Sequence, residues 1–367
     1  MSRALALLPL FAVTQVVAAP LQDGPYVVRT PSGAWVARWI EGDDSAPRVR
    51  ESAVAAGGEV TVPAVGALPA FKVRLRSLVA APVANEVKLP PDVPLFVMAD
   101  THGEYAIAVE LLRKQKVIDS RLKWSFGKGR LAVLGDIFDR GPNHTEIMWL
   151  LYSLEAQAKA AGGAVYVMLG NHESMALGGD ERYLNPKYAK VRDALNAPRY
   201  ASLWDKDSLL GQWLRTKAAV MKIGDYLCLH GGISAEVVQR GLTLAQMNDS
   251  VRRSLGDRQP DGFVMGPDGP LWYRGYFPDA ARESGSTVAT SDDIARILSF
   301  YEAKEIFVGH TIVSTVTPLF DGRVVAVQVY PHRDDTTARP EMQGLLVKQG
   351  VLYRARIDGT IESLATR

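Results

Sequence analysis

Hydrophobic and polar positions follow two different patterns along this chain, and the pattern changes near residue 94. Before that point, short segments alternate apolar and polar residues, as in YVVRT (26–30) and AWVARWI (34–40). Alternation with a period of two is typical of strands that bury one face, and the PSG between the two segments predicts a turn. We therefore expect a hairpin here, within a small β-rich domain over residues 20–80. A stretch rich in Pro and Ala follows and predicts a linker over residues 81–93.

After residue 94, continuous apolar runs replace the alternation, and each run ends in polar residues. Runs of this length are typical of strands buried on both faces. Apolar residues at helical spacing separate the first three runs, whose ends lie about one βαβ unit apart. The pattern predicts an α/β catalytic domain over residues 94–367 that binds its ligand at the carboxyl ends of the strands. The runs are PLFVMAD (94–100), RLAVLGD (130–136), AVYVMLGN (164–171), DYLCLHGG (225–232) and EIFVGHT (305–311).

Two segments of this domain show no matching strand pattern. Residues 174–221 are mixed and partly helical, and the loop 256–290 is rich in Gly and Pro, so we expect both to cap the site. The last apolar runs, from VVAVQVY (324–330) onward, predict strands and hairpins that complete a second sheet.

The N-terminus has the features of a secretory signal peptide. Arg3 precedes an apolar stretch over residues 4–13, and small residues precede position 20. This predicts a signal peptide over residues 1–19, removed on export to the periplasm or the medium. The chain has one cysteine, Cys228, so an intramolecular disulfide is excluded.

Composition and charge exclude two classes of function. The chain is 47% hydrophobic and 22% charged, as is ordinary for a globular protein, and its formal net charge of +2 argues against a nucleic-acid partner. No apolar run outside the N-terminus is long enough to predict a membrane span in the mature chain. The oligomeric state is left open by the sequence.

The polar residues at the strand ends form a set that chance does not explain, because four of the six histidines belong to it. A lone Asp there would be a turn or a helix cap, and a lone His a satisfied surface or core residue. Together they offer oxygen and nitrogen ligands without a thiolate, which suits Mn, Fe, Zn, Ni or Mg. We expect two divalent ions, with Mn as the first choice and Asp136 as the bridge. The set is Asp100, His102, Asp136, Asp139, Arg140, Asn171, His172, His230 and His310.

Five blocks of sequence carry a family resemblance. ADTHG (99–103), GDIFDRG (135–141), GNHE (170–173), HGG (230–232) and GHT (309–311) resemble the signature blocks of the calcineurin-like metallophosphoesterases, phosphoprotein phosphatase type. The leading β region and the LWYRGY segment are similar to the Shewanella-like protein phosphatases. The resemblance implies a two-sheet metallophosphoesterase sandwich flanked by helices, here preceded by the small β domain. Ala99 departs from the glycine that usually opens the first block.

The resemblance also implies a role for each residue. Asp100, His102 and Asp136 would hold one metal, and Asp136, Asn171, His230 and His310 the other. A metal-bridging hydroxide would attack phosphorus. His172, oriented by Asp139, would protonate the leaving oxygen. Arg140 would clamp the phosphate, and Arg274 is the candidate for the second phosphate-binding arginine. His144 and His332 match no block and are interpreted as surface residues or as supports of the site.

The function expected is a metal-dependent protein phosphatase that hydrolyses phosphoprotein, with phosphotyrosine ahead of phosphoserine or phosphothreonine. A cysteine-dependent tyrosine phosphatase is excluded, because Cys228 lies within an apolar run and Ser234, not arginine, stands six positions on. A dinucleoside polyphosphate hydrolase or another small-molecule phosphoesterase remains the alternative. Trp272, Tyr273 and Tyr276 could receive a phosphotyrosine ring or a base, or could anchor their loop. An inactive binding module is disfavoured because every residue of the set is present.

Overall fold

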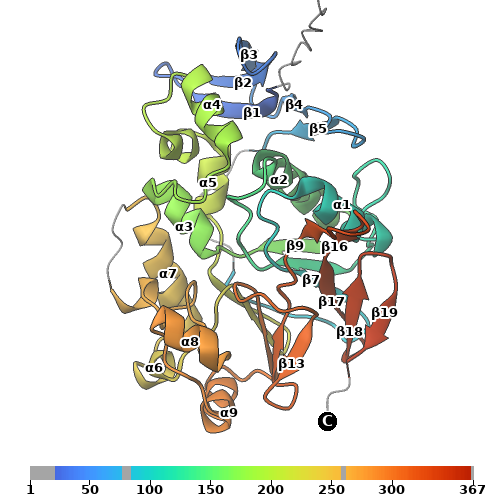
Figure 1. Cartoon of the computed structure of the whole chain (residues 1–367), viewed down its shortest axis with the longest axis vertical. Coiled ribbons are helices and arrows are strands. Elements are labelled where there is room, and N and C mark those ends of the chain that lie inside the picture. Colours follow the sequence, from blue (N-terminus) through green and yellow to red (C-terminus); the bar gives the residue numbers. More distant parts are fainter. Residues whose placement is uncertain (1–20, 77–83, 258–261, 365–367) are drawn as a thin grey trace, which may run out of the picture.

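Two six-stranded sheets stack face to face in the computed structural model, which describes residues 21–76, 84–257 and 262–364 (Figure 1). This is the predicted α/β sandwich. The first sheet contains, in spatial order, β19 (Ile361–Ser363), β18 (Val351–Arg356), β17 (Gln343–Lys348), β7 (Leu95–Met98), β8 (Arg130–Val133) and β9 (Ala164–Val167). The second contains β13 (Thr317–Leu319), β14 (Val324–Ala326), β12 (Glu305–Val308), β11 (Tyr226–Leu229), β10 (Val220–Ile223) and β6 (Glu86–Val87).

Four of the five apolar runs form central strands of the two sheets, and the fifth forms β9 at the edge of the first sheet. β7, β8 and β9 are parallel, as are β11 and β12. Side chains alternate between faces along a strand, so Leu95 and Val97 pack into the core between the sheets, while Phe96 and Met98 pack into the core beneath the helices. Because both faces are covered, these strands read as continuous apolar runs.

Helices cover the outer faces of the sandwich. α1 and α2 connect the parallel strands of the first sheet, and α6 to α9 surround the second. Thr243 begins α7 with a capping box, since its side chain accepts from Gln246 N and the Gln246 side chain accepts from Thr243 N. The helices are α1 (Tyr105–Lys114), α2 (His144–Ala160), α3 (Asn171–Gly178), α4 (Pro186–Ala194), α5 (Leu209–Arg215), α6 (Ala235–Gln239), α7 (Leu244–Ser254), α8 (Pro278–Ser284) and α9 (Ser291–Phe300), with 3-10 turns η1 (Tyr200–Trp204) and η2 (Phe263–Met265).

The C-terminal strands join a different sheet from the one expected. β17, β18 and β19 extend the first sheet, with Leu345 of β17 opposite Val97 of β7. β14 and its antiparallel neighbour β13 belong to the second sheet. The prediction that the C-terminal runs complete the second sheet is therefore wrong for β17, β18 and β19, which belong to the first sheet. Alternation of apolar and polar residues identifies a strand, but it does not show which other strand pairs with it.

The segment 174–221 is also more ordered than its sequence suggested. It contains the end of α3, then α4, η1 and α5, and it runs into β10, which begins at Val220. The amphipathic stretch WLRTKAAVMKI divides between α5 and β10. The Asn248 side chain of α7 accepts from Ala219 N at 2.7 Å and from Val220 N at 2.9 Å. These two hydrogen bonds hold the backbone where α5 has ended and β10 begins.

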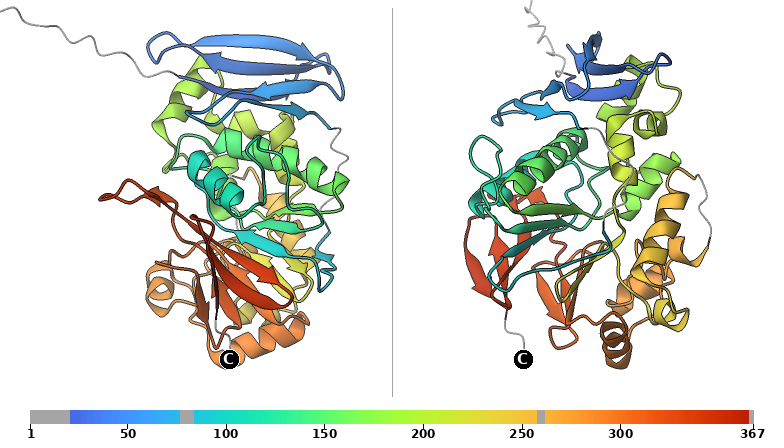
Figure 2. Two further views of the ribbon diagram at one scale, coloured as in Figure 1. Left: turned by 90° about the vertical axis from the view of Figure 1, so that its right-hand side faces the viewer. Right: turned by 180° about the vertical axis from the view of Figure 1, so that it is seen from behind.

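The N-terminal β region packs against the catalytic part at one end of the molecule (Figure 2). The predicted hairpin is present, with Val27 opposite Ala37. Its buried residues share a continuous core with α2, and Trp149 Nε1 donates to Pro25 O at 2.9 Å. The region contains β1 (Asp23–Arg29), β2 (Trp35–Glu41) and β3 (Arg48–Val54) in one sheet, and β4 (Glu59–Val62) with β5 (Phe71–Arg74) in a hairpin. Another hairpin, β15 (His332–Arg333) with β16 (Pro340–Glu341), follows β14.

Two predicted segments fall partly or wholly outside the described residues. The signal peptide at 1–19 lies outside them, as do residues 81–83 of the predicted linker. The rest of that linker is not featureless, because Glu86–Val87 form β6, parallel to β10. Of the helices in the part of the chain that is described, none has the length and apolarity to cross a membrane.

Candidate active site

The predicted ligands converge where the central strands of both sheets end. Asp100 follows β7, Asp136 follows β8, and Asn171 follows β9. His230 and His310 follow β11 and β12 in the second sheet. Parallel strands end at a common edge, which is why residues up to 210 positions apart meet here. All six predicted ligands are at most 6% exposed.

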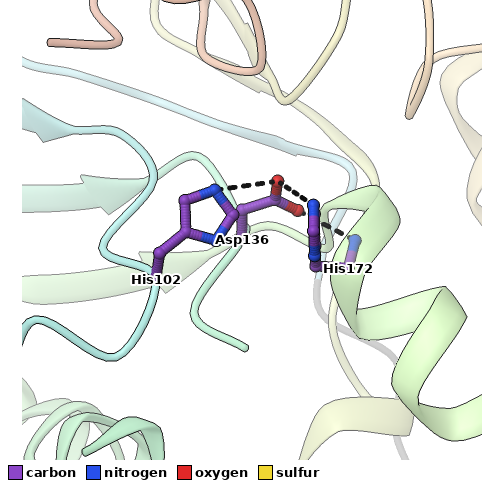
Figure 3. A group of neighbouring side chains, drawn as sticks. All are labelled: His102, Asp136 and His172. Atoms are coloured by element: carbon purple, nitrogen blue, oxygen red, sulfur yellow. Dashed lines mark hydrogen bonds and ion pairs between the residues drawn. The ribbon is translucent and has the colours of Figure 1, made fainter. Parts of the chain in front are cut away.

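Asp136 lies at the centre of the cluster. Its Oδ2 is 3.2 Å from His230 Nε2 and 3.7 Å from His102 Nε2. The same oxygen is 3.8 Å from His172 Nε2, as Figure 3 shows. Its Oδ1 accepts from His172 N at 3.0 Å. One carboxylate therefore faces two groups of donors, the position a bridging ligand would take.

On one side of Asp136 lie His102 and Asp100. His102 Nδ1 is 3.0 Å from Phe138 O, which directs Nε2 toward the carboxylates. That Nε2 is 3.8 Å from Asp100 Oδ2. Asp100 Oδ1 in turn accepts from His310 N at 3.2 Å, so this carboxylate also links the two strands' ends.

On the other side lie Asn171, His230 and His310. His230 Nδ1 donates to Leu134 O at 2.8 Å, which directs Nε2 into the cluster. That Nε2 is 2.9 Å from Asn171 Oδ1 and 3.1 Å from His310 Nδ1. His310 Nε2 is buried and has no hydrogen-bond partner among the described residues. The nitrogen that faces the cluster is Nδ1, so this is the atom of His310 that could ligate a metal there.

The donor set fits two divalent ions. Two trios, His102 with Asp136 and His172, and Asp136 with His230 and His310, each offer ligand atoms within 4.8 Å of one another. Both trios share Asp136, and all donors are nitrogen or carboxylate oxygen. His172, expected to be a proton donor, belongs to the first trio, so its position also allows metal ligation.

Charges within the cluster influence one another strongly. Burial acts to lower the pKa of His230, but Asp136 and Asp100 outweigh it and raise the pKa to about 9. Burial acts to raise the pKa of Asp136, but His230 and His172 hold it well below its usual range. Burial raises the pKa of Asp100 to about 7. The site therefore concentrates negative charge on Asp136, in surroundings that stabilise it.

His172 and Asp139 form a buried pair beside this cluster. Nδ1 of His172 lies 2.6 Å from Oδ2 of Asp139. Burial alone would lower the pKa of His172, but Asp136 and Asp139 raise it above the ordinary value. A histidine whose pKa is raised by carboxylate partners, with Nε2 toward the cluster, has the properties of a general acid.

Several site residues have left-handed backbone angles although none is glycine. The φ values are 51° at Asp136, 70° at Asp139 and 63° at Arg140, with His102 at 41° and His310 at 61°. Such angles cost on the order of 1–3 kcal/mol each and persist only where surrounding contacts impose them. Strain is thus concentrated in the loops that aim the functional side chains.

Glu173 supports this backbone, and the sequence assigned it no role. Its carboxylate accepts from Ile137 N at 2.7 Å and from Asp136 N at 2.9 Å. It also accepts from Gly170 N at 2.6 Å. The signal was present, because Glu173 belongs to the GNHE block and occupies the third position of α3, where an acidic side chain reaches back to the helix start.

Arg140 and Arg274 both lie near the cluster. Arg140 is exposed, whereas Arg274 is half-buried and donates through Nη1 to His310 O and Thr311 Oγ1, both at 3.2 Å. Burial, and then the charge of Arg140, lower the pKa of Arg274, although Asp100 and Asp136 oppose the change. Two guanidinium groups that repel each other across one site are suited to share an anion. The structure thus places the predicted second arginine at the cluster.

Aromatic residues form part of the rim, and two of them, Tyr183 and Tyr330, were not suggested by the sequence. Tyr183 is 45% exposed, and its ring centroid lies 5.2 Å from that of His172. The Arg140 guanidinium lies 5.4 Å from the Tyr183 ring and 5.7 Å from the Tyr330 ring. Tyr330 is the last residue of the VVAVQVY run, so the rule that site residues lie at the ends of apolar runs could have identified it. No sequence signal marks Tyr183.

Of the three aromatic residues that the sequence suggested in the 256–290 loop, one lies at the site and two anchor the loop. Trp272 reaches the edge of the site, 6.1 Å from the His310 ring. Tyr273 and Tyr276 are buried, and the Tyr276 hydroxyl accepts from Ile233 N at 2.9 Å. They anchor the loop and do not line the site.

The two unassigned histidines differ from each other. His332 is exposed, as expected. His144 is fully buried and stacks on Tyr188 with centroids 3.6 Å apart, so the surface interpretation is wrong for it. A signal was present, because Ile147 and Leu151 follow His144 three and seven positions on, at the spacing of one helix face.

Comparisons with known proteins agree with this geometry. The model of the family described as calcineurin-like phosphoesterase matches residues 93–314. A solved structure of a cold-active protein tyrosine phosphatase is 36% identical, with a TM-score of 0.80, and the match covers 94% of this chain and 98% of that one. A structure of the cold-active protein-tyrosine phosphatase of a psychrophilic Shewanella species is 35% identical, with the same TM-score, and the match covers 94% of this chain and 99% of that one.

A curated relative is more distant. Shewanella-like protein phosphatase 2 of Arabidopsis thaliana is 25% identical over 59% of this chain and 66% of its own length. The chain therefore spans just under two thirds of that relative.

Proposed function

The chain belongs to the calcineurin-like phosphoesterase family, and from this premise we propose that it is a metal-dependent phosphomonoesterase that acts on phosphoprotein, with phosphotyrosine preferred. One observation carries the proposal. Asp136 faces donor groups on both sides, and the His172–Asp139 pair faces the same carboxylate. Arg140 and Arg274 border this arrangement.

The residues around Asp136 fit two divalent ions. Asp100 and His102 would hold one with Asp136, and Asn171, His230 and His310 would hold the other with it. When bound, such ions supply a water-derived nucleophile at neutral pH and neutralise charge on the phosphoryl group. Manganese is proposed as the first choice, because oxygen and nitrogen ligands suit it.

The chain's own groups complete the chemistry. Arg140 and Arg274 would bind the phosphoryl oxygens with their planar donor groups. His172 would donate its Nε2 proton to the leaving oxygen, while Asp139 accepts from Nδ1 and keeps the ring oriented. Cys228 takes no part, because it is buried in β11 and burial raises the pKa of its thiol.

Two observations support an aromatic ester as substrate. Similarity extends over 94% of the chain to a protein named as a tyrosine phosphatase. The Tyr183 and Tyr330 rings also lie 5.4 and 5.7 Å from the Arg140 guanidinium, where an aryl ring attached to a bound phosphate would find apolar surface. Extensive similarity to a named protein phosphatase favours phosphoprotein over dinucleoside polyphosphate.

A metal-stripped preparation tests the proposal. We expect no activity until Mn is added, and comparison with Zn, Fe and Mg ranks the metals. Substrates are a phosphotyrosine peptide, a phosphoserine peptide and a dinucleoside tetraphosphate. Faster cleavage of the last would replace the proposal with the alternative. Asp136→Asn should lose both metal and turnover, and an active Asp136→Asn would remove the bridging role.

Export is proposed on the N-terminal pattern of Arg3 followed by apolar residues 4–13. Expression of the full chain in a bacterium with fractionation, and N-terminal sequencing of the product, tests this. Cleavage near residue 19 and recovery outside the cytoplasm are expected. An intact N-terminus in the cytoplasmic fraction would contradict it.

A further inference from the structure

The loop that carries Asp139 and Arg140 is held by the turn that begins α4. Arg140 N donates to Tyr183 O at 2.9 Å, and Asn185 Nδ2 donates to Arg140 O at 2.7 Å. Lys187 Nζ then donates to Pro142 O at 2.7 Å. The backbone on both sides of Arg140, where two successive residues have left-handed angles, is therefore fixed by residues 183–187.

Lys187 is itself held by charges from two other elements. Its Nζ lies 3.1 Å from Asp23 Oδ1 and 3.7 Å from Glu146 Oε1. Both carboxylates are buried, and the lysine side chain is 15% exposed. Burial acts to lower the pKa of Lys187, but Asp23 and Glu146 outweigh it and raise the pKa. The ammonium group thus stays charged and directed at the loop.

Asp23 belongs to β1 in the N-terminal sheet. Its Oδ2 accepts from Tyr26 OH and, at 3.3 Å, from Thr145 Oγ1 of α2. Every step of this connection is a hydrogen bond or an ion pair, and all its members except the exposed Pro142 are buried or half-buried. It runs from the N-terminal sheet through Lys187 to the carbonyl of Pro142, two residues after Arg140.

We propose that Lys187 is a positioning residue for Arg140 and Asp139, and that Asp23 acts through it, so that the N-terminal sheet is part of the catalytic unit. The inference rests on the proposed function. The physical reason is that an unfavourable backbone conformation returns to a relaxed one unless its hydrogen-bond partners are themselves fixed. A buried ammonium between two carboxylates provides a fixed donor.

A second buried lysine provides a matched control. Lys217 is 3% exposed and donates to Glu155 Oε1 at 2.5 Å. Arg76, next to the N-terminal hairpin, also pairs with Glu155, at 3.0 Å. This network likewise joins the N-terminal region to α2, and its described contacts do not include the Asp136–Pro142 loop.

The experiment compares Lys187→Met, Lys187→Arg, Asp23→Asn and Lys217→Met in the full chain loaded with Mn. Readouts are kcat and KM for p-nitrophenyl phosphate, calorimetric affinity for inorganic phosphate, metal content and melting temperature. Assays are run well below the melting temperature of each variant. Lys187→Met should lower kcat/KM roughly 10- to 100-fold, through a higher KM and a lower kcat, with unchanged metal content.

The remaining variants separate positioning from stability. Lys187→Arg should have a kcat/KM close to that of wild type. Asp23→Asn should have a kcat/KM between those of wild type and Lys187→Met. Lys217→Met should lower the melting temperature while kcat/KM stays within about twofold of wild type, because a remote stabilising pair does not alter the site. Equal kinetic losses in Lys187→Met and Lys217→Met would overturn the proposal.

Two further outcomes are decisive. If Lys187→Met does not fold, the isosteric Asp23→Asn carries the test, and unchanged kcat/KM and phosphate affinity in it would overturn the proposal. If the wild type hydrolyses no phosphomonoester, the proposed function fails. The positioning role is then judged on phosphate affinity, which Lys187→Met should weaken about tenfold if Arg140 loses its placement.

Discussion

Nδ1 of His172 lies 2.6 Å from the carboxylate of Asp139, and both side chains are buried beside Asp136. The pair joins the start of α3 to the loop after β8. Because the carboxylate accepts from Nδ1, the opposite nitrogen Nε2 faces the donor cluster. The contact between His172 and Asp139 therefore leads to the most direct predictions about catalysis.

Asp139→Asn should lower kcat by about 10²-fold or more, because the imidazolium loses the charge that orients and stabilises it. Asp139 raises the pKa of His172, so its removal lowers that pKa. The acid is active when protonated, and the alkaline limb of the kcat profile should therefore move to lower pH. Kinetics from pH 5 to 9 measure both effects. An unmoved alkaline limb would contradict the assignment.

His172→Asn distinguishes a proton donor from a metal ligand, since His172 Nε2 also lies within one candidate trio of ligands. We expect kcat to fall about 10²- to 10⁴-fold with metal content unchanged. Elemental analysis of the purified variant provides the measurement. Loss of one ion per chain would reassign His172 as a ligand. An aryl ester with a very acidic leaving group should be least affected, because it needs little protonation.

Tyr183→Ala tests whether the exposed aromatic ring selects the substrate. Tyr183 lies next to His172 and Arg140, so its loss should raise KM for a phosphotyrosine peptide about 3- to 10-fold, as expected for one aromatic contact. The KM for a phosphoserine peptide should change little. Tyr183→Phe keeps the ring and should behave as wild type. Equal changes for both peptides would show that Tyr183 does not discriminate between them.

Gly170→Ala should damage the cluster by crowding. Gly170 has φ of −102°, which alanine accepts, but an added Cβ would lie 2.1 Å from Asp136 Oδ1 and 2.5 Å from Asp136 N. We expect roughly 10- to 100-fold weaker metal binding and about 1–3 kcal/mol of lost stability. Gly266→Ala is the control, because its nearest atom would be Phe263 O at 3.4 Å. Metal titration and chemical unfolding compare the two.

Glu146→Gln should flatten the pH dependence of stability. Burial raises the pKa of Glu146 to about 7, although Lys187 opposes it, and Asp23 and Tyr105 also face this carboxyl group. A folded pKa above the unfolded one means that stability is highest at low pH and falls as pH rises from about 4.5 to 7. Wild type should therefore lose up to about 3 kcal/mol over this range relative to Glu146→Gln.

Denaturant unfolding at pH 5, 6, 7 and 8 measures this difference. The comparison between the two proteins isolates Glu146, because every other titrating group is common to both. Parallel curves for wild type and Glu146→Gln would show that the carboxyl group does not titrate in this range.

Local sequence was sufficient for the strands formed by the apolar runs and for the polar residues that follow them. β7 and β8 are covered on both faces, so each appears as an unbroken apolar run, and the first polar residue after it marks the sheet edge. β9 is apolar as well, but Ala164 and Tyr166 are only half-buried at the edge of the sheet. Asp100, Asp136 and Asn171 follow from that rule and from the convergence of parallel strand ends. Glu173 was within reach of the same reasoning, since its place in the first turn of α3 is a local feature.

What the sequence by itself determined was therefore the five apolar strands and the polar residues at their ends, because hydrophobic period and motif spacing are local properties. Tertiary structure decided which sheet received β17 and β18, because strand pairing depends on neighbours distant in the chain. It also brought Tyr183 to His172 and Asp23 to Lys187, the latter across 164 residues. Such contacts arise only when separate elements pack together. The sequence pattern of one segment does not show which distant residue that segment will contact.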